Sequence, residues 1–190
     1  GMVHGAYELG SGLGFGIEVG YLLASHEVTE HTSALTPNGL SSANEGRATD
    51  RMRLQGFLAG ANVGYHVGED YPFAVRLGAG ILLGELRDER DGSFVARAGD
   101  GYRTSPVATF PGVTYGYIDP EIRAGVRFLE HFELSGSVQA LMLVGITQPK
   151  FDPSIEVRAG SDGLGSYGED TLMGGFVVAI APGANLRYDY

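Results

Sequence analysis

The sequence predicts an all-β fold, an antiparallel up-and-down β-barrel of about eight strands. This domain spans 1–190, or the chain is a barrel trimmed at one or both ends. Three observations lead to this fold class. Long segments alternate between apolar and small or polar residues, as β-strands do. Glycine, at 31 of 190 residues, lies mostly inside these segments. The connections between them alternate between long and short.

Apolar alternation identifies the strands in order. In the first of them, Phe15, Ile17 and Val19 share one face, and Gly14, Gly16 and Glu18 share the other. Six such strands are predicted, at about 12–28, 52–66, 73–85, 115–128, 132–144 and 171–181. Two shorter candidates, 3–9 and 185–190, bring the count to eight.

The connections are sorted by length. Those at 67–72 and 129–131 are short, whereas 29–50, 86–112 and 148–170 are long and polar, so we expect three long loops at one end. Outer-membrane barrels have this asymmetry. Aromatic residues gather beside the short turns, where an interfacial aromatic girdle is expected: Tyr65, Tyr71, Phe73, Phe128 and Phe132. Ordinary aromatic strand ends are the alternative interpretation.

Charged residues of both signs fall on the small-residue faces of the strands. They are Glu18, Arg76, Asp119, Glu121, Arg123, Arg127 and Glu133. A narrow barrel interior makes each of them costly unless it is paired. We therefore expect a salt-bridged charge network in the lumen rather than an open channel. The alternative is that these charges face water on a soluble barrel.

Composition and motifs argue against several function classes. A net charge of −10 argues against nucleic-acid binding, and without cysteine there is no disulfide or thiol chemistry. The His26–His31 spacing is one residue too long for a zincin motif, and the glycines at 78–84 continue a strand instead of opening a helix. The acidic segment 88–92 lacks the closing glutamate of a calcium loop. We expect no cofactor, no metal site, no catalytic residue and no enzymatic activity.

These features together resemble the small bacterial outer-membrane barrels of the outer membrane protein A and X type. Leu186, Tyr188 and Tyr190 resemble the C-terminal assembly signal of that family. The resemblance implies a bacterial outer-membrane location, contact with membrane lipid and lipopolysaccharide, and delivery by the barrel assembly machinery. It also implies an extracellular partner that binds through the loops 29–50, 86–112 and 148–170.

Two functions of different classes stay open at this point. The first is an outer-membrane barrel with a structural, adhesive or envelope-interaction role. The alternative is a soluble lipocalin-like barrel whose apolar face lines a cavity for a small apolar ligand. A narrow pore is a third hypothesis, from which we expect little or no steady conductance because side chains nearly fill an eight-stranded lumen.

Overall fold

A computed structural model describes residues 1–128, 131–147, 155–168 and 176–188. It contains ten β-strands in one antiparallel sheet, which confirms the predicted all-β, up-and-down architecture. The described residues form no α-helix, only a short 3₁₀ turn, η1 (Gly160–Asp162). No helix among them is long and apolar enough to cross a membrane.

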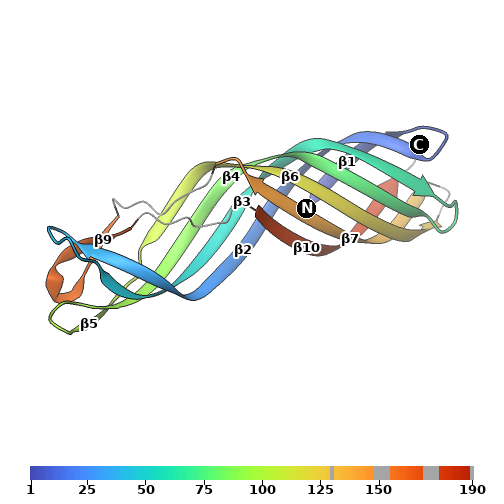
Figure 1. Ribbon diagram of the computed structural model, residues 1–190. Coiled ribbons are helices and arrows are strands. Elements are labelled where there is room, and N and C mark those ends of the chain that lie inside the picture. Colours follow the sequence, from blue (N-terminus) through green and yellow to red (C-terminus); the bar gives the residue numbers. More distant parts are fainter. Residues whose placement is uncertain (129–130, 148–154, 169–175, 189–190) are drawn as a thin grey trace.

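Seven strands pair in chain order to form a long curled sheet (Figure 1). They are β1 (Met2–Glu8), β2 (Leu13–Pro37), β3 (Asn44–Val67), β4 (Phe73–Val95), β6 (Val107–Phe128), β7 (Phe132–Gly145) and β10 (Phe176–Tyr188). Three short strands cover the far end of β2 and β4: β5 (Gly101–Thr104), β8 (Glu156–Arg158) and β9 (Leu164–Tyr167). In Figure 1 these short strands lie at the left end, beyond the wider curled part.

The sheet is not closed, which corrects the prediction of an eight-stranded barrel. In the described parts of the chain, no strand pairing joins the first strand, β1, to the last, β10. The two predicted strands at 171–181 and 185–190 are one strand, because β10 continues through Pro182 and Gly183. Proline is tolerated there because β10 is an edge strand, whose outer N–H groups have no ladder partner.

In one half of the sheet, apolar side chains cover the outer, solvent-exposed face. We call this surface the apolar belt; it comprises the outward residues of 13–23, 57–67, 73–83 and 118–128 and the facing parts of β7 and β10. Ile17 and Phe57 are each 70% exposed, and Leu77 is 48% exposed. On the inner face of the same strands lie glycine and charged residues, among them Glu18 and Asp119, which are almost fully buried.

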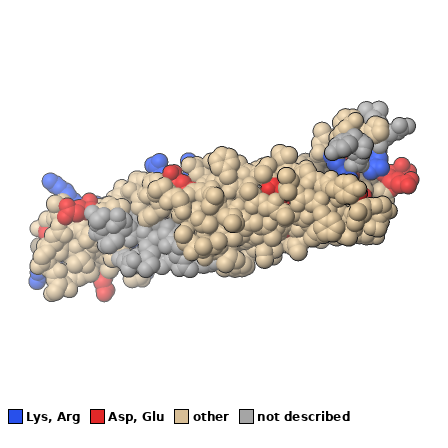
Figure 2. All heavy atoms as spheres, turned by 90° about the horizontal axis from the view of Figure 1, so that it is seen from above, with Lys and Arg blue, Asp and Glu red and all other residues tan. Residues whose placement is uncertain are grey.

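In the other half the two faces exchange character. We call this part the extension; it comprises 24–56, 84–113 and 155–168. Its inner face is an apolar core that includes Leu35, Leu54, Leu86, Phe94 and Tyr167. Its outer face is mostly polar, with a few exposed apolar residues such as Val95 and Val107. Figure 2 shows charged side chains gathered toward the two ends of the molecule, with a mostly uncharged stretch between them.

The exchange takes place at one level across neighbouring strands. Tyr21, Phe57 and Leu83 are cross-strand partners at the edge of the apolar belt. Four residues further along each strand, the partners on the outer face are Ser25, Arg53 and Arg87, aligned in the same way. Three neighbouring strands, β2, β3 and β4, therefore turn from apolar to polar on their outer face at the same level.

This exchange explains why two of the predicted loops are wrong. The segments 29–50 and 86–112 are mostly strand, since β2, β3, β4 and β6 run far into them. In β3 the apolar residues stand at odd positions in the belt, such as Phe57, and at even positions in the extension, such as Met52 and Leu54. A search for one continuous apolar face therefore stops at the exchange. The third predicted loop, 148–170, includes β8 and β9, and its residues 148–154 and 169–170 lie outside the described residues.

Candidate functional site

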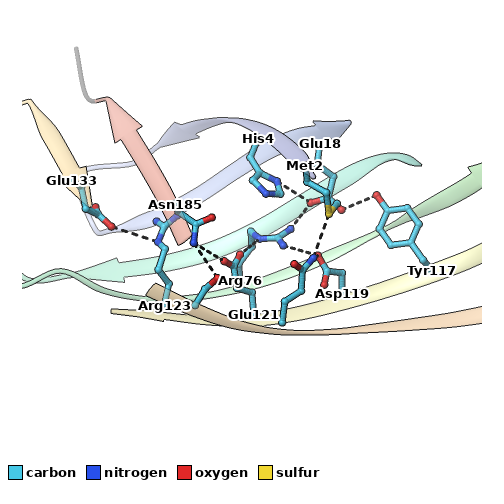
Figure 3. Close-up of polar contacts among 12 residues, drawn as sticks. Met2, His4, Glu18, Arg76, Tyr117, Asp119, Glu121, Arg123, Glu133 and Asn185 are labelled. Atoms are coloured by element: carbon cyan, nitrogen blue, oxygen red, sulfur yellow. Dashed lines mark hydrogen bonds and ion pairs between the residues drawn. The ribbon is translucent and has the colours of Figure 1, made fainter. Parts of the chain in front are cut away.

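Arg76 of β4 lies at the centre of a cluster of carboxylates inside the belt half of the sheet (Figure 3). Its Nε donates to Glu121 at 2.6 Å and its Nη2 to Asp119 at 2.5 Å, while its Nη1 donates to Glu18. The three acids come from β2 and β6, so one guanidinium joins strands on both sides of β4. All three carboxylates are buried.

Other side chains also contact these three acids. We call Arg76, the three acids and these further side chains the Arg76 cluster. The Tyr117 hydroxyl donates to Glu18 at 2.7 Å, and the Gln139 amide donates to Asp119 at 2.7 Å. His4 of β1 lies 3.5 Å from Glu18, and Asn185 of β10 donates to Glu121 at 3.5 Å. The cluster thus draws side chains from each of the seven strands except β3, and Figure 3 shows the labelled ones around Arg76.

Glycine makes the room that the cluster needs. Gly60, Gly80 and Tyr117 are cross-strand partners, and a Cβ on Gly60 would lie 2.4 Å from the Tyr117 hydroxyl. A Cβ on Gly78 would lie 2.4 Å from a carboxylate oxygen of Glu18. The inward glycines of β3 and β4 therefore leave space for the tyrosine ring and for the ion pairs.

The remaining predicted charges form a second group nearer the short turns. Arg123 lies 3.5 Å from Glu133, and His66 approaches Glu133 at 3.4 Å. Arg127 and Arg187 are the two cross-strand partners of Glu133, on β6 and β10. Arg187 also forms an ion pair of 2.6 Å with Glu8 of β1. All seven charged residues singled out in the sequence thus point inward, and the structure divides them into these two groups.

Sequence reasoning missed His4, Tyr117, Gln139 and Asn185, because neutral and histidine side chains on the small-residue faces carry no charge signal. Only the alternation along each strand, which puts these four residues on the same face as the charged ones, could have placed them inward. It also missed a third group of paired charges, which lies in the extension. There Arg90 donates two hydrogen bonds of 2.7 Å to Asp50, and His31 lies 3.1 Å from the same carboxylate.

The Asp50–Arg90 pair lies beneath two of the short strands, β5 and β9, inside the extension. The guanidinium of Arg90 lies 5.1 Å from the centroid of the Tyr167 ring, and the Tyr167 hydroxyl is hydrogen-bonded to Thr104. Burial raises the pKa of the Tyr167 phenol, which keeps this hydroxyl protonated at neutral pH. The arrangement joins β9 to β5 beside one buried cation.

The predicted aromatic girdle lies at the short-turn end of the belt. Tyr65, Tyr71, Phe73 and Phe128 are exposed there. Phe132 is half-buried, stacks on Phe128 at 5.8 Å and contacts Tyr188 at 5.1 Å between ring centroids.

The predicted C-terminal signal falls on β10. Leu186 and Tyr188 point outward from this strand and are exposed, at 67% and 54%. Tyr190 lies outside the described residues.

The described residues contain no group of three or more histidine and acidic side chains arranged to hold a metal ion. A groove of about 660 Å³ on the extension is lined by residues such as Glu27, Arg51, Arg53 and Arg87. Comparison with known protein families, with curated proteins and with solved structures finds no match for this chain.

Proposed function

We propose that this chain is a bacterial outer-membrane β-barrel protein with a structural or envelope-interaction role. The observation that carries the proposal is the exchange of apolar and polar faces along single strands. Apolar residues on an outer face, with paired charges inside, suit a sheet surrounded by lipid. Polar residues outside and an apolar core inside suit a sheet surrounded by water.

The length of the apolar belt supports the same proposal. On β2, β3, β4 and β6 the belt covers about eleven residues, from 13 to 23, 57 to 67, 73 to 83 and 118 to 128. A membrane-spanning β-strand tilted by about 45° needs about 9–11 residues. The exposed aromatic residues at the short-turn end match the position of an interfacial girdle.

The extension then lies outside the bilayer, on the side that the longer connections occupy in outer-membrane barrels. Its strands carry a mostly polar outer surface with arginine and glutamate on neighbouring strands, such as Arg51 beside Glu27 at 3.4 Å. Contact with lipopolysaccharide or with an extracellular partner is assigned to this surface.

The lipocalin-like alternative has less support. A soluble barrel that binds an apolar ligand needs an apolar inner face around a cavity. In this chain the inner face of the belt half carries Arg76 and its carboxylates, and the apolar inner face of the extension is a packed core.

Two arginine substitutions on the same strand, β6, test the membrane proposal. Ile122 is 58% exposed in the belt and Val107 is 48% exposed in the extension. In vesicles we expect Ile122→Arg to lower the free energy of unfolding by roughly 2–4 kcal/mol, because the charge must enter the bilayer. Val107→Arg changes it by less than about 0.5 kcal/mol, since that surface faces water.

Urea unfolding of vesicle-reconstituted protein measures both variants. An equally small effect of the two substitutions contradicts the proposal, because it means that water surrounds the belt as well. A chain that stays monodisperse at high concentration without detergent contradicts it too.

A further inference from the structure

The curled sheet has two open edges, β1 and β10, that face one another. In the described residues they are joined by side chains, such as the Arg187–Glu8 ion pair of 2.6 Å, and by no backbone ladder. The inward residues Ala6, Ala181 and Gly183 on these strands are exposed, whereas inward Glu18 and Glu133 on the neighbouring strands are 1% exposed. The interior is therefore accessible between the two edges.

Strand direction decides what fits between the edges. Each of the seven long strands is antiparallel to the next, so β1 and β10 run in the same direction. Direct closure would make a parallel pair, whereas bacterial outer-membrane barrels are antiparallel throughout and have an even number of strands. One further strand, antiparallel to both edges, satisfies both conditions.

The backbone of β1 is oriented to receive such a strand. Gly1 and Tyr21 exchange both of their backbone hydrogen bonds, at 3.0 and 2.9 Å. Because this pattern alternates along an antiparallel ladder, the N–H groups of His4, Ala6 and Glu8 point away from β2 and toward β10. An open edge of this kind does not persist in hydrocarbon.

A second copy of the chain does not fit. If two copies have their extensions on the same side of the membrane, β1 of one copy meets β10 of the other, and these strands are again parallel. An antiparallel pairing of the two β1 strands would place the extensions on opposite sides. Neither arrangement of a second copy therefore supplies the occupant.

We infer that the gap between β1 and β10 is a docking site for one antiparallel β-strand of about 9–11 residues. Its outward positions carry apolar side chains, to continue the belt, and its inward positions carry small ones, opposite Ala6 and Gly183. The inference rests on the proposed membrane function and adds the chemistry of the missing partner.

The first experiment measures the separation of the edges. The chain has no cysteine, so Tyr7→Cys in β1 and Leu186→Cys in β10 give a single reactive pair. A disulfide needs Cα atoms within about 7 Å, whereas an intervening strand separates the edges by about 10 Å. We expect a bis-maleimide of about 10 Å to link the pair and mild oxidation to leave it unlinked. Rapid and complete disulfide formation overturns the inference in favour of direct parallel closure.

The second experiment tests capture of a strand in trans. The probe is a synthetic peptide that copies residues 13–23, with Val19 replaced by cysteine, mixed with the Tyr7→Cys protein. We expect disulfide capture on the order of tenfold above that of a control peptide carrying prolines at the Gly16 and Ile17 positions, which lacks ladder donors toward both edges. Equal capture of the two peptides overturns the inference.

A matched pair of edge variants locates the capture. Ala6→Pro removes an N–H that points into the gap and should reduce capture roughly fivefold. Gly5→Ala keeps every N–H and adds a Cβ where no atom lies within 4 Å, so capture is unchanged. If the yield of captured peptide is unchanged with Ala6→Pro, the peptide does not pair with the edge of β1, and the inference is wrong. Partition of the protein into vesicles, measured separately, tests the membrane proposal. Peptide capture in detergent-free buffer tests the docking site, even if the protein does not enter vesicles.

Discussion

At the scale of single residues, Arg76 illustrates how a buried charge is tolerated. Its guanidinium donates to Glu18, Asp119 and Glu121, so each of its three nitrogen atoms meets a carboxylate. Three acids around one cation leave an excess of negative charge, and Tyr117 and Gln139 offset it by donating hydrogen bonds. The removal of the one cation therefore has a larger effect than the removal of any one acid.

We expect Arg76→Leu to lower the free energy of unfolding by about 3–5 kcal/mol, because it leaves buried carboxylates without a cation. The control is Arg103→Leu, which removes an ion pair with Asp91 from a side chain that is 73% exposed, and should cost less than about 1 kcal/mol. Denaturant titration measures both. Addition of Asp119→Asn to Arg76→Leu should recover part of the loss; no recovery would mean that packing, and not charge, causes it.

Gly80 tests the packing beneath the Tyr117 ring. A Cβ at this position would lie 2.2 Å from the carbonyl oxygen of Ala59 and 2.8 Å from the Tyr117 ring. Gly80→Ala should therefore lower the free energy of unfolding by roughly 1–3 kcal/mol, as overpacking does. Gly136→Ala, on β7, adds a Cβ where no atom lies within 4 Å and is the control. Equal melting temperatures for the two variants would contradict this account.

At the scale of elements, the belt strands could be predicted and the extension strands could not. Alternation predicted 73–85 as a strand, but β4 continues to Val95. From Leu86 onward the inward residues are apolar or paired, such as Arg90, and the outward ones are charged, such as Arg87 and Glu89. In sequence this reads as a charged loop, because the partners that make Arg90 an interior residue, Asp50 and Tyr167, lie on distant segments.

The charged residues of the candidate site could be placed inward by their position in the alternation, but their pairing could not. Arg76 and Glu18 belong to strands that are not neighbours, and they meet only because the sheet curls. The expected closure into eight strands was wrong for a related reason. Local periodicity defines each strand, whereas the number of strands around the curl depends on which edges meet.

One pair of strands places two like charges opposite one another, and the effect of this repulsion on stability can be measured. Arg53 of β3 and Arg87 of β4 are direct cross-strand partners on the outer face. Like charges placed opposite one another are unfavourable, so Arg53→Thr should raise the free energy of unfolding by about 0.2–1 kcal/mol. Arg51→Thr is the control, because Arg51 faces Glu89 across the ladder and its loss removes an attraction. Stability measured at low salt should move in opposite directions for the two.

At the scale of the whole molecule, one set of strands serves two environments. The inner polar contacts of the belt half hold the curl together from inside, since side chains of β1, β2, β4, β6, β7 and β10 meet around Arg76. In the extension an apolar core between the strands holds the sheet together instead. In the proposed membrane arrangement, the paired strands of the extension carry the partner-binding surface beyond the bilayer.

The Arg76 cluster also predicts how the protein behaves toward ions. Its side chains cross the interior from β4 to β2 and β6, and Gln139 of β7 reaches both Asp119 and Met2 of β1, at 2.7 and 3.3 Å. We therefore expect no steady current from the reconstituted protein in planar bilayers, because a narrow interior filled by side chains leaves no continuous water path.

Arg76→Ala combined with Asp119→Ala removes the ion pair at the centre of the Arg76 cluster and leaves Glu18 and Glu121 on the inner face. Because the remaining carboxylates attract cations, we expect this variant to show brief, cation-selective openings. Single-channel recording with unequal salt on the two sides measures the selectivity. Large, stable currents from the unmodified chain would contradict a blocked interior. Anion-selective openings of the variant would mean that Arg123, Arg127 and Arg187 line the path instead.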